Sequence, residues 1–177
     1  MTSLHRATGF TITEMTIVLA ITAVLAGIGA PSFRTLLQNQ RLTATTNDFF
    51  AALALTRSEA IKRGSRVDLV PADGKQWENG WVIYVDNNDN QIFDDGDQVI
   101  FTHGAVPQGL TIKSALTDSS RPYIAYNGAG RTRTDASSQL PQLGTISFSL
   151  DKKVRRIKLN FAGRARSCNP ESDTSCD

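Results

Sequence analysis

The feature that most constrains the fold is an uninterrupted apolar run near the N-terminus. From Met15 to Phe33 no side chain is charged, and only two threonines and one serine are polar. As a helix, such a run is about as long as the hydrocarbon core of a bilayer is thick. Glu14 directly precedes it, although a carboxylate costs about 2.5 to 3.5 kcal/mol at the bilayer centre and less near its edge. The run therefore predicts a helix in lipid or in a fibre core, beside an acid that a plain anchor does not need.

A short leader precedes this helix. Residues 1–9, MTSLHRATG, end at the dipeptide Gly9-Phe10, and Pro31 lies near the end of the apolar run. A secretory signal peptide or a single-pass anchor would explain the apolar run alone. Together with Glu14, the pattern resembles a type IV prepilin signal instead. The resemblance implies cleavage between Gly9 and Phe10 by a prepilin peptidase, N-methylation of Phe10, and pairing of Glu14 with the terminal amine of a neighbouring subunit during assembly.

The leader also predicts an orientation. Arg6 precedes the apolar run, with His5 at most partly charged, and cationic flanks stay on the cytoplasmic side of a membrane. We therefore expect residues 10–33 to cross the inner membrane once and place the C-terminal domain in the periplasm. After assembly the domain would lie in an extracellular pilus, with other major and minor pilins as partners.

The helical pattern continues through residues 34–64. Apolar side chains recur at Leu42, Phe49, Leu53 and Ala60, so one face of this amphipathic half should pack on a sheet. Lys62 and Arg63, followed by Gly64, predict the C-terminal end of the helix.

The stretch AALALTRSEAIKRG, residues 51–64, resembles the helix signature of the GspH, FimT and FimU group of pseudopilins and minor pilins. The matching positions are Arg57, Ser58, Glu59, Ala60 and Arg63. The alternative is that residues 57–59 form only a solvated helix face with an ion pair.

Beyond Gly64 the apolar period changes to two, which predicts a β-rich head over residues 65–177. Strands are expected at residues 66–70, 81–86, 98–103, 110–114, 123–127, 144–150 and 155–161. One long helix followed by many short strands predicts an α+β fold of the type IV pilin kind, with an antiparallel sheet packed on the amphipathic half of the helix. The segment Gly80–Phe101 resembles the Trp-led strand, acidic turn and return strand of the GspH and FimT domain.

Charge is unevenly distributed along the head. Residues 68–98 hold eight acids and one base, whereas residues 129–166 hold nine bases and two acids. The acidic turn, with Asp86, Asn88, Asn90 and Asp97, resembles a calcium loop. However, Gln91 replaces the glycine of the sharp turn and Asp97 is shorter than the bidentate Glu, so a turn without an ion is favoured.

The head carries no recognisable catalytic constellation. His5 leaves with the leader, and His103 stands without a serine or acid at a spacing typical of a catalytic site. We expect no enzyme, no cofactor and no metal. Cys168 and Cys176 are expected to form a disulfide in a periplasmic domain, since two thiols without a nearby histidine make at most half a metal site.

The basic C-terminal region is the candidate binding site. In RRIKLNF, Ile157, Leu159 and Phe161 alternate with Arg156 and Lys158, so the three apolar side chains should face the core and the cations should face outward. Next come Gly163, which allows a tight turn, and the alternating pair Arg164 and Arg166.

The run NFAGRARSCNP is similar to the GRxR tail of FimT-type minor pilins, which are implicated in DNA uptake during natural transformation. The resemblance implies binding of double-stranded DNA by Arg164, Arg166 and Gly163, with Arg156 and Lys158 extending the patch. We expect phosphate contacts without base readout. Two alternatives stay open: the patch is only solvated, or it contacts the next subunit in a structural FimU-like pilin or a GspH-like type II secretion pseudopilin.

Overall fold

The computed structural model describes residues 9–137 and 139–176, apart from the side chains of residues 28–32. Residues 1–8 of the expected leader, with His5 and Arg6, and the side chain of Pro31 lie outside the described residues. The elements in chain order are α1 (Ile12–Arg63), β1 (Val67–Pro71), η1 (Trp77–Asn79), β2 (Trp81–Val85), β3 (Gln98–His103), β4 (Leu110–Leu116), β5 (Ile124–Tyr126), β6 (Thr132–Arg133), β7 (Gly144–Leu150), β8 (Lys153–Leu159), β9 (Ala165–Cys168) and η2 (Thr174–Cys176).

The helix begins with a capping box. Thr11 directly precedes α1, and its backbone N–H donates to Glu14 Oε2 over 2.8 Å. In return the Glu14 N–H donates to Thr11 Oγ1 over 3.3 Å. The two residues thus satisfy two backbone donors that the first helical turn leaves without partners. Glu14 therefore has a local role in starting the helix, and the T-x-x-E pattern in the sequence was the signal for it.

The chain divides into two compact units, Met1–Gln38 and Asn39–Asp177. In the first unit the described large apolar side chains of the helix are exposed, and Leu19, for example, is 66% exposed. Among the described residues, no helix is both long and apolar enough to cross a membrane. Because the expected span over residues 10–33 contains the undescribed side chains of 28–32, the span stays a prediction.

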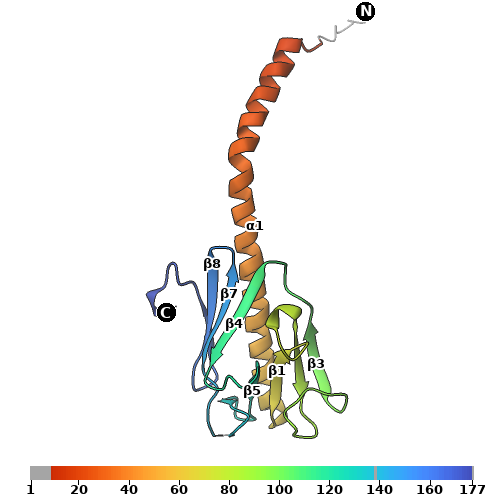
Figure 1. Ribbon diagram of the computed structural model, residues 1–177, viewed down its shortest axis with the longest axis vertical. Helices are drawn as coiled ribbons and strands as arrows, with labels where there is room; N and C mark the ends of the chain where they lie inside the picture. The colour runs from red at the N-terminus through yellow and green to blue at the C-terminus, as the bar shows by residue number, and fades with distance from the viewer. Residues whose placement is uncertain (1–8, 138, 177) are drawn as a thin grey trace, which may run out of the picture. The chain divides into compact units, whose positions relative to one another are not determined.

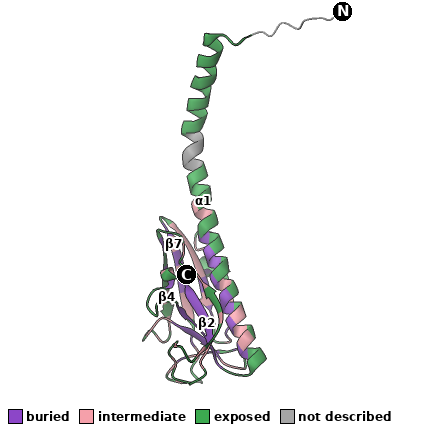
Figure 2. Cartoon of the chain, turned by 90° about the vertical axis from the view of Figure 1, so that its right-hand side faces the viewer, coloured by how far each residue is buried: buried purple, intermediate pink, exposed green. Residues whose placement is uncertain are grey.

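The second unit is an α+β head with two antiparallel sheets around the C-terminal half of α1 (Figure 1). The strand orders are β3-β2-β1-β5-β6 and β4-β7-β8-β9. Buried residues follow one side of this half of the helix (Figure 2), among them the predicted Leu42, Phe49, Leu53 and Ala60. The fold class is therefore confirmed, with two sheets in place of one.

Phe49 lies at the centre of the core. Its ring makes edge-to-face contacts with Trp77 and Trp81 at centroid distances of 5.1 Å, and with Phe148 at 5.4 Å. Trp81 belongs to the five-stranded sheet and Phe148 to the four-stranded sheet. One helical side chain thus joins both sheets, and such pairs add about 0.5 to 1.5 kcal/mol each beyond area burial.

A second, smaller core covers the outer face of the five-stranded sheet. Beside it, Arg66 donates to both carboxylate oxygens of Asp68 over 2.7 Å and to Asp135 over 2.6 Å. Burial raises the pKa of Asp68, and the Arg66 guanidinium opposes that rise. Asp135 also accepts from Arg121 over 2.7 Å, so its charge is balanced within this cluster.

Candidate functional site

The predicted basic site is an antiparallel hairpin formed by β8 and β9. Lys158 lies directly opposite Arg166, and Arg156 lies opposite Cys168. The intervening Ile157 is buried in the core, so the expected alternation of core and outward residues is present along β8.

The prediction was wrong for Phe161, which is 71% exposed. β8 ends at Leu159 because a turn starts at the next residue. In this turn Asn160 Oδ1 accepts the N–H groups of Ala162 and Arg164, both over 3.0 Å. Asparagine side chains commonly form such turns with their own backbone, and here the turn takes Phe161 out of the strand.

Gly163 is required in this turn for two reasons. Its φ is +72°, a left-handed conformation that glycine adopts without a steric penalty. A Cβ on Gly163 would also lie 2.6 Å from the carbonyl oxygen of Gly130. The backbone of the turn therefore packs directly against the loop between β5 and β6.

The C-terminal tail closes back on the hairpin. Cys168 and Cys176 form a disulfide with an S–S distance of 2.03 Å, which confirms the expected pairing. Arg166 donates to Asp173 and to Ser175 Oγ, both over 2.5 Å. Hydrogen bonds from Ser175, together with the charge of Arg166, lower the pKa of Asp173.

Two further predicted cations also bond to this tail. Arg156 donates to the carbonyl oxygen of Cys176 over 3.1 Å, and Lys158 donates to that of Ser175 over 3.2 Å. Arg164 is different: it is exposed, and within the described part of the chain its guanidinium has no hydrogen bond or ion pair. The structure thus separates one available arginine from three cations that hold the tail.

Arg57 of the helix signature contacts the same turn. Arg57 Nη2 donates to the carbonyl oxygen of Ala162 over 3.4 Å. Glu59 forms the helical ion pair that the alternative interpretation expected, at 2.9 Å from Arg63 and 3.3 Å from Lys62. The hydrogen bond from Arg63 is the main cause that lowers the pKa of Glu59. Residues 57–59 therefore combine a contact to the head with a surface ion pair.

The acidic turn between β2 and β3 bonds its own amides. Asp86 accepts the N–H of Gln91 over 2.7 Å, and Asp97 accepts that of Asn87 over 3.1 Å. Gln91 has a φ of +67°, so it adopts the left-handed conformation for which a glycine was expected. Within the residues that the structure describes, no group of His, Cys, Asp and Glu is placed to hold a metal.

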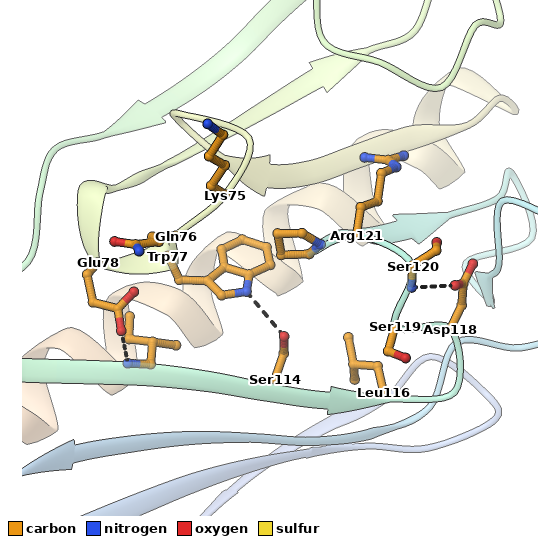
Figure 3. A pocket seen from close by; sticks show the side chains of 12 residues that line it. Lys75, Gln76, Trp77, Glu78, Ser114, Leu116, Asp118, Ser119, Ser120 and Arg121 are labelled. Carbon is orange, nitrogen blue, oxygen red and sulfur yellow. Dashed lines mark hydrogen bonds between the residues drawn. The ribbon is translucent and has the colours of Figure 1, made fainter.

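A hollow of about 440 Å³ lies between η1, β4 and the loop that follows β4 (Figure 3). The Trp77 indole N–H points at Ser114 Oγ, 3.4 Å away, and Glu78 accepts the Ile112 N–H over 2.8 Å. Asp118 accepts the Tyr123 hydroxyl over 2.6 Å. These polar groups connect neighbouring elements, so their main effect here is to hold η1 and the loop in place.

Comparison with known protein families shows to which family the chain belongs. Residues 45–163 match the family described as Type II transport protein GspH. The chain belongs to the GspH family. This confirms the resemblance that the helix signature and the segment Gly80–Phe101 indicated.

Solved structures show the same fold. The type IV minor pilin FimU of Pseudomonas aeruginosa is 16% identical, with a TM-score of 0.57 over 77% of this chain and 95% of that one. The minor pseudopilin EpsH of the Vibrio cholerae type 2 secretion system is 15% identical, with a TM-score of 0.52 over 73% and 98%. No curated protein matches the chain significantly. The GspH family and the pilin-like fold are thus established for the head.

Proposed function

We propose that this GspH-family protein is a FimT-like minor pilin that enters a type IV pilus and binds extracellular DNA for uptake in natural transformation. The observation that carries the proposal is Arg164, which is exposed beside the glycine turn and has no partner among the described residues. A guanidinium binds phosphate oxygens through two parallel hydrogen bonds. Arg164 would therefore make the first contact with the DNA backbone.

The other predicted cations have different roles. Arg166 would exchange Asp173 for a phosphate, while Arg156 and Lys158 hold the tail and add positive potential. Contacts of this kind are independent of base sequence and weaken with salt, because each neutralised phosphate releases counterions. The expected ligand is double-stranded DNA, bound through its phosphates.

The N-terminal unit would mediate incorporation of the protein into the pilus. We propose that the prepilin peptidase cleaves between Gly9 and Phe10, that Phe10 is then methylated, and that Glu14 pairs with the amine of a neighbouring pilin. The exposed apolar side chains of this unit support burial in the inner membrane and later among other pilins. When the Glu14 carboxylate and this amine are buried together in an apolar environment, their attraction offsets part of the free-energy cost of burying each charge.

The second candidate is a structural subunit without DNA binding, either a FimU-like priming pilin or a GspH-like pseudopilin of type II secretion. The tail contacts favour it, because Arg156, Lys158 and Arg166 already have partners. Gene deletion separates the two candidates. Loss of pilus assembly or secretion with transformation intact would favour the structural role.

The direct test uses the full chain in a non-ionic detergent and a DNA mobility shift at low salt. Arg164→Gln with Arg166→Gln should weaken binding at least about tenfold, or about 1.4 kcal/mol. The matched control is Lys113→Gln with Lys152→Gln, which removes the same charge at two exposed lysines outside the turn. Equal affinity of the arginine variant and the wild type, with both folded, would overturn the DNA role.

A further inference from the structure

The chain contains a second copy of its arginine turn. Residues 127–133 read NGAGRTR and residues 160–166 read NFAGRAR, identical at five of seven positions. The first copy connects β5 to β6, and the second connects β8 to β9. The sequence therefore repeats the G-R-x-R pattern at Gly130–Arg133, although Arg131 and Arg133 are not among the binding residues expected from the sequence.

The two turns have the same internal hydrogen bonds. Asn127 Oδ1 accepts the N–H groups of Ala129 and Arg131 over 3.1 and 3.0 Å, as Asn160 does in the other turn. The Asn127 N–H donates to the Arg131 carbonyl over 2.9 Å, and the equivalent bond from Asn160 to Arg164 is 3.1 Å. Gly130 has a φ of +71°, against +72° for Gly163. The arginines therefore leave both turns at equivalent positions.

The strand register extends this equivalence. Tyr126 pairs with Thr132 in the first hairpin, as Leu159 pairs with Ala165 in the second. Arg133 thus corresponds to Arg166, and Arg131 corresponds to Arg164.

The two turns are in direct contact. A Cβ on Gly163 would lie 2.6 Å from the Gly130 oxygen and 3.1 Å from the Thr132 nitrogen. A Cβ on Gly130 would instead meet two side chains of α1, lying 2.7 Å from Ile61 Cδ1 and 3.2 Å from Arg57 Nε. Arg57 also donates to the Ala162 carbonyl of the second turn. Gly163 therefore lets the two turns pack backbone to backbone, whereas Gly130 lets its own turn pack against α1, where Arg57 contacts both turns. Two separate hairpins thus bring their arginines to one region of the head.

The arginines of the first turn are available. Arg131 is exposed and Arg133 is half-buried. In the described residues neither guanidinium has a hydrogen bond or ion pair, and Arg133 Nε is buried without a partner. The nearby Asp135 is already paired with Arg66 and Arg121, so it does not neutralise them. A hollow of about 520 Å³, lined by Arg131 and by the exposed Phe161, joins the two turns.

We propose that the Asn127–Arg133 turn is a second phosphate-binding element that forms one DNA-binding surface with the Asn160–Arg166 turn. This inference rests on the proposed function and adds Arg131 and Arg133 to its site. The paired turns would place guanidinium groups from both hairpins on neighbouring phosphates of one duplex. Binding would then involve more phosphates than the C-terminal pair alone, and its salt dependence would be steeper.

The test measures the affinity of the full chain in detergent for a fluorescent DNA duplex by anisotropy, over a series of salt concentrations. Arg131→Gln with Arg133→Gln should weaken binding at least about tenfold and reduce the slope of log K against log salt by about 0.9 per lost phosphate contact. Arg131→Lys with Arg133→Lys keeps both charges and should keep most of the slope. Lys113→Gln with Lys152→Gln is the charge-matched control, and Arg131→Gln alone replaces the double variant if that variant melts early.

The outcomes distinguish this inference from the proposed function. Wild-type affinity and slope in Arg131→Gln with Arg133→Gln, when Arg164→Gln with Arg166→Gln binds weakly, overturn the second element and leave the proposed function standing. Equal losses in the arginine variants and the lysine control overturn it as well, since net charge then explains the binding. A wild-type chain that binds no duplex at low salt overturns both.

Discussion

Replacing Gly163 by alanine tests the packing of the two turns in isolation from DNA. The substitution has two costs. An L-residue in the left-handed region costs about 1 to 2 kcal/mol, and Gly163 has a φ of +72°. The new Cβ would also meet the Gly130 oxygen at 2.6 Å, and overpacking of this kind costs about 1 to 3 kcal/mol. We therefore expect Gly163→Ala to lower the free energy of unfolding by about 2 to 5 kcal/mol.

The chain offers a matched control for the backbone cost. Gly74 has a φ of +70°, and a Cβ built on it would meet nothing within 4 Å. Gly74→Ala should therefore cost only the conformational part, about 1 to 2 kcal/mol. The difference between the two variants measures the contact between Gly163 and the Gly130 loop.

Tryptophan fluorescence gives a readout that belongs to the head. Trp77 and Trp81, the two tryptophans of the chain, are both buried in the head core. Urea titration of the full chain in detergent, followed by their emission, should show a lower midpoint for Gly163→Ala than for Gly74→Ala. Equal midpoints for the two variants would refute the argument that the turns pack backbone to backbone.

Two further predictions concern the tail and acid pH. Replacing Cys168 and Cys176 by serine removes a cross-link across eight residues, which contributes up to about 2.5 kcal/mol in the chain-entropy model. Amide hydrogen exchange should therefore accelerate at positions 175 and 176, and unchanged protection there would contradict this. The hydrogen bond from Tyr123 is the largest cause that lowers the pKa of Asp118 from 3.8 to about 2. A lowered pKa stabilises the fold above the unfolded value, so this contribution should be lost as pH falls from about 4 to about 2. Tyr123→Phe should flatten that part of the curve of melting temperature against pH, and a curve parallel to the wild type would show that the bond does not matter.

Elements with strong local signals could be predicted from the sequence. The expected strands at residues 98–103 and 144–150 have the observed bounds, because clear alternation or turn residues mark their ends. The buried helix positions Leu42 and Phe49 followed from helical periodicity alone.

Other features depend on partners far away in the sequence. β6 has two residues, Thr132–Arg133, and exists because it pairs with β5, so periodicity cannot reveal it. Phe161 continued the alternation of β8, but the hydrogen bonds of Asn160 end the strand before it. The hydrogen bonds from Arg156 and Lys158 to the tail form only because the tail folds back onto β8, and no local sequence pattern indicates that path. The repeated turn can be found in the sequence, but only the contact of Gly163 with Gly130 shows that the two copies lie side by side in the fold.

The position of Phe49 has a mechanical consequence. Its ring touches Trp81 of one sheet and Phe148 of the other, and it belongs to the helix on which both sheets pack. A pull along α1 would therefore be transmitted to both sheets at the same point, and neither sheet could separate from the helix without breaking an aromatic contact.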